Sequence, residues 1–380
     1  MKIAFITLGF EPLRTSGLDL SGERLVKAML SAGHQVAVIA GQREPLPEVH
    51  NHPALKIYRI GLGKTDWIGF GYRAAHLLNA LEPFDIVHFW DVHFGWAYRG
   101  RFVASLQHSF RQRLESLGPF SFSRGAIWSF RFLYYSMAQV FAEIPAARRA
   151  CGLLAGSATT RAEFIQQYGF DPNQITLARH GIDTDFFRPV QNTGEMRRCL
   201  GLREGEPVLL FAGFITPRKG LEYLAQALPL ISPVPKLLIV GEWRSAAYRQ
   251  RVLQMLEPVK DLVIETGFVP DEQMPAFLSL ADIYVSTSLM EGFGLPPAEA
   301  LSCETPVVAV DAGALAEVVG PGGILVPPRD LEGFASAISS LLQDTRRRKE
   351  LGKRGREHVE QEFSIQAMLN STLEAYERFR

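Results

Sequence analysis

Two glutamates eight residues apart, Glu291 and Glu299, bracket a stretch that contains two glycines and two prolines. A glycine turn that runs into a proline-started helix exposes backbone N–H groups at the helix N-terminus, where an anion such as a diphosphate binds. Carboxylates repel phosphate but accept strong hydrogen bonds from hydroxyl groups. A nucleotide sugar has phosphates in its middle and hydroxyl groups on both sides. We therefore expect these carboxylates to bind the hydroxyl groups of such a ligand. The alternative is a surface turn with an acidic helix start.

A second candidate loop, residues 211–220, follows the first predicted strand of the C-terminal half and contains Lys219 next to a glycine. A lysine in such a strand-to-helix turn can neutralise a departing diphosphate, and one stabilising donor of this kind is worth about 3 kcal/mol. Both candidate loops follow buried strands, and open α/β sheets bind ligands at the carboxyl ends of their strands. An exposed turn lysine without a ligand is the alternative for Lys219.

The N-terminal half offers weaker signals. Gly17 lies in a loop of small residues that opens a helix, and small residues let a ligand approach the backbone. His108 follows an apolar run and is a candidate to face a cleft, although a histidine at a strand end is more often structural. Asp183 and Asp185 form a pair that can hold a divalent ion. That pair falls between the two halves of the chain, so we predict no metal site.

Short apolar runs alternate with amphipathic segments along the 380 residues. In the first half these runs cover residues 3–8, 36–40, 55–60, 85–89, 102–106, 152–155 and 175–178, and in the second half 208–212, 236–240, 262–265, 282–286, 306–310 and 323–326. This alternation is typical of buried parallel strands in doubly wound α/β sheets. The length favours two domains, and the alternation restarts near residue 207.

Charge divides unevenly between the halves: residues 1–186 hold 19 Lys+Arg against 15 Asp+Glu, and the remainder hold 21 against 25. The segment 99–149 alone holds eight arginines and two acids, interleaved with aromatic residues. Cationic and apolar side chains together suit interfacial binding. We therefore predict that 99–135 contacts an anionic or lipid-linked acceptor at a membrane surface, with Arg111 and Arg113 as acceptor-binding candidates. An amphipathic core helix is the alternative.

Three cysteines far apart provide no disulfide framework and favour a reducing compartment. The first apolar run predicts a strand rather than a signal peptide, and no segment approaches the length of a membrane span. We expect a cytoplasmic protein, either free or peripheral on the inner face of the membrane, with no nucleic acid partner.

On these residues the chain resembles the GT-B glycosyltransferases, and within them the large retaining glycosyltransferase family four (glycosyl transferases group one). The resemblance is strongest over 208–328 and rests on the pair Glu291 and Glu299 together with residues 305–309, 317–319 and 323–327. It implies two Rossmann-like domains facing across a cleft. Residues 1–186 would bind the acceptor, residues 187–362 would bind the nucleotide sugar, and a helix over 363–380 would cross back to the first domain.

The resemblance implies transfer of a sugar from a nucleoside diphosphate sugar to an acceptor hydroxyl, with retention at the anomeric carbon and without metal or other cofactor. The acceptor would be a glycolipid, a polysaccharide or a small-molecule glycoside. The catalytic residues would be His108, Lys219 and Glu291. The donor would be bound by Gly17, Gly213, Arg218, Lys219, Phe268, Glu291, Phe293, Gly294, Leu295 and Glu299, with Glu299 on the ribose and Glu291 on the sugar.

One departure from the family pattern concerns the loop after the first strand of the C-terminal half. The family usually has arginine directly after the glycine, whereas Phe214 follows Gly213 here. One of two cations facing the diphosphate is therefore missing, and Arg218 is a candidate substitute. Two alternatives stay open: a nucleotide-sugar-binding protein with little or no transferase activity, and a nucleotide-sugar 2-epimerase. A third alternative, a pyridoxal-dependent phosphorylase, is disfavoured because this sequence has no suitable lysine motif.

Overall fold

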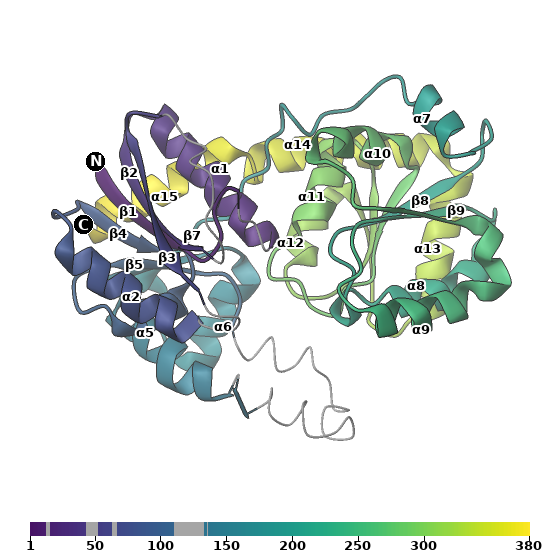
Figure 1. Ribbon diagram of the computed structural model, residues 1–380. Coiled ribbons are helices and arrows are strands. Elements are labelled where there is room, and N and C mark those ends of the chain that lie inside the picture. The colour runs from purple at the N-terminus through teal and green to yellow at the C-terminus, as the bar shows by residue number, and fades with distance from the viewer. Residues whose placement is uncertain (13–15, 43–51, 63–66, 110–132, 135) are drawn as a thin grey trace. The chain divides into compact units, whose positions relative to one another are not determined.

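The computed structural model describes the chain except for residues 13–15, 43–51, 63–66, 110–132 and 135. The chain folds as two compact units, one formed by Met1–Gly181 with Ile365–Arg380 and the other by Ile182–Ser364 (Figure 1). Ile182 pairs with Ser364 in an isolated parallel bridge, so the second unit begins and ends at one point. The sequence placed these divisions at 186/187 and 362/363.

The first unit is built on a seven-stranded parallel sheet with strand order β3-β2-β1-β4-β5-β6-β7. Its strands are β1 (Lys2–Thr7), β2 (Gln35–Gln42), β3 (Leu55–Gly61), β4 (Ile86–Phe89), β5 (Val103–Leu106), β6 (Gly152–Ala155) and β7 (Ile175–Leu177). Its described α-helices are α1 (Gly17–Ser31), α2 (Trp67–Ala80), α5 (Ile144–Arg149), α6 (Ala158–Tyr168) and α15 (Ile365–Phe379).

Alternate residues of each strand feed two separate cores, as the period of a strand requires. In β1, Ile3 and Phe5 belong to the core shared with α1 and α15, whereas Ala4 and Ile6 belong to the core shared with α2, α5 and α6. The last helix of the chain therefore covers the same face of this sheet as the first helix. The sheet is buried on both faces, and this confirms the predicted α/β class.

His88 and His180 are fully buried in this unit as neutral imidazoles. On β4, His88 contacts the Tyr376 hydroxyl of α15 at 2.7 Å through Nδ1 and the Ser105 hydroxyl of β5 at 2.8 Å through Nε2. After β7, His180 Nδ1 contacts the Ser21 hydroxyl of α1 at 2.8 Å. Burial lowers the pKa of His88 to about 3 and that of His180 to about 4. These contacts tie α1 and α15 to the sheet.

The second unit is built on a six-stranded parallel sheet with strand order β10-β9-β8-β11-β12-β13. Its strands are β8 (Val208–Ala212), β9 (Lys236–Val240), β10 (Val263–Gly267), β11 (Ile283–Ser286), β12 (Val307–Val310) and β13 (Gly323–Val326). Its described α-helices are α7 (Gly194–Cys199), α8 (Leu221–Ala227), α9 (Ala246–Leu256), α10 (Met274–Leu280), α11 (Leu295–Ser302), α12 (Leu315–Val319), α13 (Leu331–Gln343) and α14 (Thr345–Glu362). Helices α10, α11, α12 and α14 cover one face, and α8, α9 and α13 the other (Figure 1).

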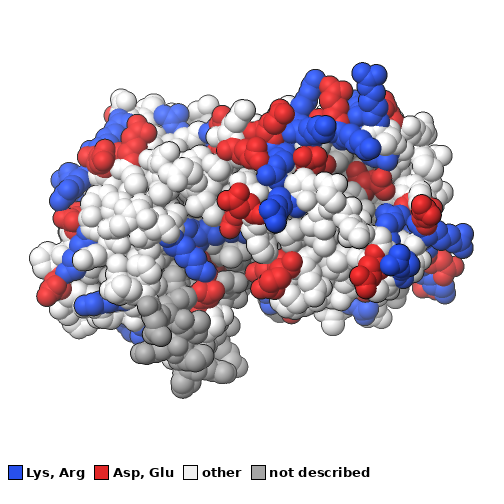
Figure 2. Space-filling model, turned by 90° about the horizontal axis from the view of Figure 1, so that it is seen from above, with Lys and Arg blue, Asp and Glu red and all other residues white. Residues whose placement is uncertain are grey.

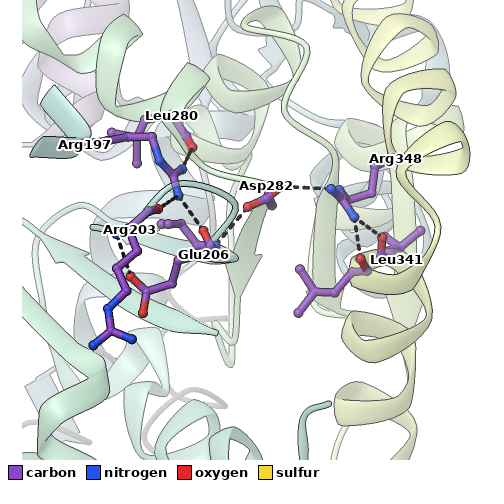
Figure 3. Close-up of polar contacts among 9 residues, drawn as sticks. Arg197, Arg203, Glu206, Leu280, Asp282, Leu341 and Arg348 are labelled. Carbon is purple, nitrogen blue, oxygen red and sulfur yellow. Dashed lines mark hydrogen bonds and ion pairs between the residues drawn. The ribbon is translucent and has the colours of Figure 1, made fainter. Parts of the chain in front are cut away.

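The amino edge of this second sheet is fastened by a polar network (Figure 3). The Asp282 carboxylate, just before β11, accepts the Val208 N–H at 2.9 Å and the Arg348 guanidinium at 3.0 Å. Arg348 also donates to the carbonyls of Leu341 and Leu342 at 2.8 and 2.7 Å, so it caps the C-terminus of α13. One arginine of α14 thereby joins two neighbouring strands to the preceding helix.

Charged side chains of both signs are interspersed on the face seen in Figure 2, without one large patch of a single sign. This pattern agrees with the formal net charge of +0. Among the described residues, no helix combines the length and the apolar character needed to cross a membrane.

We predict that Arg348→Met lowers the free energy of unfolding by about 2–3 kcal/mol, because the half-buried Asp282 loses its cationic partner and two helix-end carbonyls lose their side-chain donor. Urea denaturation checks this value. The matched control is Arg354→Met on the same helix, whose exposed pair with Glu350 should contribute less than about 0.5 kcal/mol. Equal losses in the two variants would contradict a structural role for the Arg348 network.

We also predict a pH dependence that comes from the buried histidines. Each protonates near pH 6.5 when unfolded but stays neutral in the fold, so the unfolded state gains protons first as the pH falls. The free energy of unfolding should therefore decrease between about pH 6.5 and about pH 4 from His180, and down to about pH 3 from His88. His180→Asn should flatten this slope by up to about 1.4 kcal/mol per pH unit. Denaturation at several pH values measures it. His76→Asn, at an exposed site on α2, should leave the slope unchanged.

Candidate functional site

The carboxyl edge of the second sheet collects most of the predicted donor-binding residues. Strands β8 and β11 are neighbours at the centre of this sheet, so the loops that follow them, 213–220 and 287–294, leave the sheet side by side. Open parallel sheets bind ligands at this edge. The topology thus unites two loops that are far apart in the sequence.

The helix that follows β11, α11, is preceded by the N-cap residue Gly294, whose φ of 109° lies in the left-handed region. Proline occupies the next two positions after Leu295, and proline has no N–H to offer. The N–H groups that this helix start can present to an anion are therefore those of Gly294 and Leu295. The Phe293 side chain is buried and packs edge-on against Phe363, with ring centroids 5.3 Å apart, which anchors the turn in the core.

A buried ion pair joins the two loops. Lys219 Nζ donates to Glu291 Oε1, and the Ser288 hydroxyl donates to the same oxygen at 2.8 Å. The two side chains are only 13% and 8% exposed. Burial acts to raise the pKa of Glu291, but the charges of Lys219 and Arg218 and the hydrogen bonds outweigh it, so the pKa lies below its ordinary value. Glu291 is therefore an ionised acceptor held next to a cation.

The backbone of the first loop is fitted closely to the second. Gly220 adopts a φ of 64°, and a side chain there would place its Cβ 2.1 Å from the Thr287 carbonyl oxygen. The Thr287 hydroxyl donates to the Lys219 carbonyl at 3.0 Å, and the Leu289 N–H donates to the Arg218 carbonyl at 2.9 Å. Only glycine fits at position 220, so Lys219 is carried on a loop of fixed shape.

Arg218, the predicted substitute cation, is turned toward the second loop. Its guanidinium donates to the Met290 carbonyl at 2.8 Å and lies 3.6 Å from Glu291 Oε2. It therefore supports the position of Glu291 in this structure.

Glu299 lies on α11, four residues after its first residue, Leu295. Burial first, then the charges of Glu291 and Glu299, raise the pKa of Tyr284, whose hydroxyl donates to the Ala212 carbonyl at 3.1 Å. Gly213 directly follows β8 and donates its N–H to the Val240 carbonyl at 3.0 Å.

Phe268 follows β10 and is 67% exposed, and Phe214 is 38% exposed. The carboxyl edge of this sheet therefore presents two aromatic rings in addition to the charged pair. An exposed ring at such an edge is available to stack on a planar ligand group.

The remaining predicted residues belong to the first unit or lie outside the described residues. Gly17 is the exposed first residue of α1, preceded by Ser16, whose N–H donates to Asp19 Oδ2 at 2.9 Å in a capping box. His108 is partly buried, two residues after β5, and the next hydroxyl, that of Ser109, donates to Glu163 at 2.7 Å. The acceptor candidates Arg111 and Arg113 lie outside the described residues.

One pair of polar residues was not predicted. His93 Nδ1 and Asp91 Oδ1 are 2.7 Å apart in the segment that follows β4, and both side chains are largely buried. A carboxylate that orients an imidazole is an arrangement suited to proton transfer or hydroxyl recognition. The available signal was a D-x-H spacing directly after a predicted strand. In the described part of the chain, no three metal-ligating side chains gather in one place.

Comparison with known proteins identifies the family. The sequence model described as Glycosyltransferase Family 4 matches residues 16–186, and the model described as Glycosyl transferases group 1 matches residues 192–358. The D-inositol 3-phosphate glycosyltransferase of Gordonia bronchialis is 31% identical over 421 residues, which cover 100% of this chain and 89% of that protein.

Two solved structures show the same fold. Sucrose-phosphate synthase from Thermosynechococcus elongatus has a TM-score of 0.84 at 24% identity, covering 99% of this chain and 98% of that one. Anabaena HepE in complex with UDP-glucose has a TM-score of 0.76 at 18% identity, covering 100% of both chains. The chain therefore belongs to the group 1 glycosyl transferases, glycosyltransferase family four, with the GT-B fold.

Proposed function

We propose that this glycosyltransferase moves a sugar from a nucleoside diphosphate sugar to an acceptor hydroxyl, with retention at the anomeric carbon. The observation that carries the proposal is the joining of Lys219, Glu291 and the start of α11 at one sheet edge. A cation and helix N–H groups suit a diphosphate, and a buried ionised carboxylate beside them suits sugar hydroxyls.

The proposed chemistry is a front-face displacement. The bond between the anomeric carbon and the diphosphate oxygen breaks, and its electron pair stays on that oxygen, where Lys219 and the N–H groups of Gly294 and Leu295 stabilise the charge. The acceptor oxygen bonds to the same face of the anomeric carbon and passes its proton to the departing phosphate. A lysine ammonium has three N–H donors, so Lys219 can keep its bond to Glu291 while it donates to the diphosphate. The proposal involves no metal and no cofactor.

The donor class is supported by the comparisons. A solved structure of the same fold is a complex with UDP-glucose, and two others of the same protein hold UDP. We therefore take a nucleoside diphosphate hexose as the donor and uridine diphosphate as the first nucleotide to test. Glu299 would accept hydrogen bonds from the ribose, and Phe268 would stack on the base.

The acceptor is proposed to bind the first unit, at or near a membrane surface. Two arginines of the basic segment serve the fold, since Arg101 donates to the Phe379 carbonyl at 3.0 Å and Arg149 to the Gly95 carbonyl at 2.9 Å. Residues 110–132 and 135 of the predicted segment 99–135 lie outside the described residues. Directly after that segment, exposed apolar side chains occur at helical spacing: Met137, Val140 and Phe141 are 51%, 60% and 69% exposed. An exposed apolar patch of this kind is typical of interaction surfaces, including membrane contacts.

A nucleotide-sugar-binding protein with little transferase activity is the second candidate, because phenylalanine occupies position 214. Binding of the donor without product in the presence of a broad acceptor panel would favour it. NMR of the anomeric proton in donor and product tests retention directly. Epimerised donor in the absence of acceptor would instead identify a 2-epimerase.

We predict that Lys219→Gln lowers kcat roughly 100- to 1000-fold, because a donor to the leaving group is lost at the step where charge develops. Its effect on donor affinity should be smaller. Glu299→Ala should show the opposite pattern, with weaker donor binding and a smaller change in kcat, since a ribose contact is the same before and during reaction. Steady-state kinetics and donor titration give both quantities.

Glu317→Ala serves as the control, because Glu317 lies on α12 and has no proposed ligand role. Thermal melting of each variant separates loss of fold from loss of chemistry. An unchanged kcat in Lys219→Gln would remove the leaving-group role of this lysine.

For the membrane contact, we predict that Val140→Ser with Phe141→Ser reduces co-sedimentation with vesicles of phosphatidylglycerol roughly tenfold, because burying a large apolar side chain contributes about 1.5–3 kcal/mol. Leu230→Ser, at a 52% exposed site in the second unit, is the matched control. Wild-type protein that stays in the supernatant at every lipid concentration would remove the membrane proposal and leave the donor chemistry untouched.

A further inference from the structure

The hydrogen bonding of the second sheet continues past the ends of β8, β9 and β10. The Gly241 N–H donates to the Gly267 carbonyl at 2.8 Å, and the Gly213 N–H donates to the Val240 carbonyl at 3.0 Å. The Ile215 N–H then donates to the Glu242 carbonyl at 2.8 Å. The loops after these strands are therefore held in register by their backbones.

One of these loops carries Arg244, whose N–H donates to the Ile215 carbonyl at 3.1 Å. Gly241 permits this close fit, because a Cβ on it would lie 2.0 Å from the Gly213 carbonyl oxygen. The residue at position 244 is consequently fixed beside the loop that contains Phe214.

The Arg244 guanidinium lies over the Phe214 ring, with 4.0 Å between Cζ and the ring centroid. Such a cation–π contact is worth about 0.5–1 kcal/mol at an exposed site, and it restricts a side chain that otherwise samples many rotamers. The side chain of Arg244 is 46% exposed, and its ion-pair contact is a distant one, 3.8 Å from NH1 to Glu242 Oε2. The guanidinium thus keeps hydrogen-bonding capacity toward solvent.

The residue that precedes this stacked pair, Gly213, lies close to the start of α11. Phe214 follows Gly213, and a Cβ on Gly213 would lie 3.8 Å from Pro296 Cγ in the first turn of that helix. Lys219 belongs to the same loop as Phe214 and donates to Glu291, which lies in the loop after the neighbouring strand β11. A planar guanidinium on this edge can form two parallel hydrogen bonds to phosphate oxygens.

We propose that Arg244 is a second cation for the donor diphosphate and that Phe214 is its positioning residue. The inference rests on the proposed function of this edge. Arg218 supports Glu291, since its guanidinium donates to the Met290 carbonyl and lies 3.6 Å from Glu291 Oε2, and Arg244 adds a cation from a neighbouring loop. Phenylalanine at position 214 then does not leave the site short of a cation, because its ring positions the guanidinium of Arg244 from the neighbouring loop.

The test is titration calorimetry of the full chain with UDP, GDP and ADP, followed by the tightest of the three and its parent nucleoside. Arg244→Gln should weaken diphosphate binding roughly tenfold, about 1.4 kcal/mol, and leave nucleoside binding unchanged. Arg244→Lys should restore part of the affinity, because charge returns without the planar fork. Arg346→Gln, an exposed arginine on α14 close to Arg348 at the amino edge, makes the same charge change and should bind like wild type.

A double-mutant cycle tests the positioning role. Phe214→Leu alone should weaken diphosphate binding roughly threefold, the equivalent of the lost ring contact. In the Arg244→Gln background the same change should have no further effect, because the ring then has no guanidinium to place. Additive losses would show that Phe214 acts independently and would overturn its role as a positioning residue.

The possible failures are distinguishable. If the wild type binds a nucleoside diphosphate and Arg244→Gln binds it equally well, or loses diphosphate and nucleoside affinity alike, the role of Arg244 is wrong and the proposed function stands. If the wild type binds none of the three nucleoside diphosphates and no nucleotide sugar, the proposed function itself is wrong.

Discussion

A carboxylate buried at the carboxyl edge of a sheet must have a cation, and in this protein that requirement joins two loops whose residues are 72 positions apart. Desolvating Glu291 without Lys219 would cost several kcal/mol. With the pair formed, the loop after β8 and the loop after β11 are locked together, and both are aligned with the start of α11. The candidate site is therefore stabilised by the same charge pair that is proposed to act on the ligand.

The two edges of the second sheet divide their roles. At the amino edge, Asp282 and Arg348 fasten the beginnings of the central strands to the junction of α13 and α14. At the carboxyl edge, the strands end in glycine-rich loops that carry Phe214, Arg244 and Phe268 with substantial exposure. Parallel strands place all their carboxyl ends at one edge, so a rigid opposite edge leaves this one available for a ligand.

The first unit depends on the end of the chain in a similar way. Helix α15 shares a core with α1, and Tyr376 contacts the buried His88 of the central strand β4. Burial keeps the His88 imidazole neutral, so protonation of His88 and detachment of the last helix are linked. The chain therefore passes through the whole second unit before the core of the first is complete.

The local sequence pattern was sufficient to predict the α/β class. Apolar runs of strand length that alternate with amphipathic segments indicate which residues are buried. All thirteen predicted runs coincide with strands, seven in one sheet and six in the other. The resemblance to the family rested on the segment from Glu291 to Glu299 and on residues 305–327 that follow it, and the comparisons then showed the family. The donor-binding role of these glutamates and of Lys219 stays a prediction.

The tertiary structure decided which side chains meet. The pairing of Lys219 with Glu291, the turn of Arg218 toward Met290, the contact of His93 with Asp91 and the stacking of Arg244 on Phe214 all depend on strand order or on side-chain direction. Strand order and side-chain direction cannot be predicted from local hydrophobic periodicity. That periodicity indicates whether a residue is buried, but not which residue lies next to it across a sheet. The sequence by itself thus determined the elements and the family, and the order of the strands determined the charge pairs of the site.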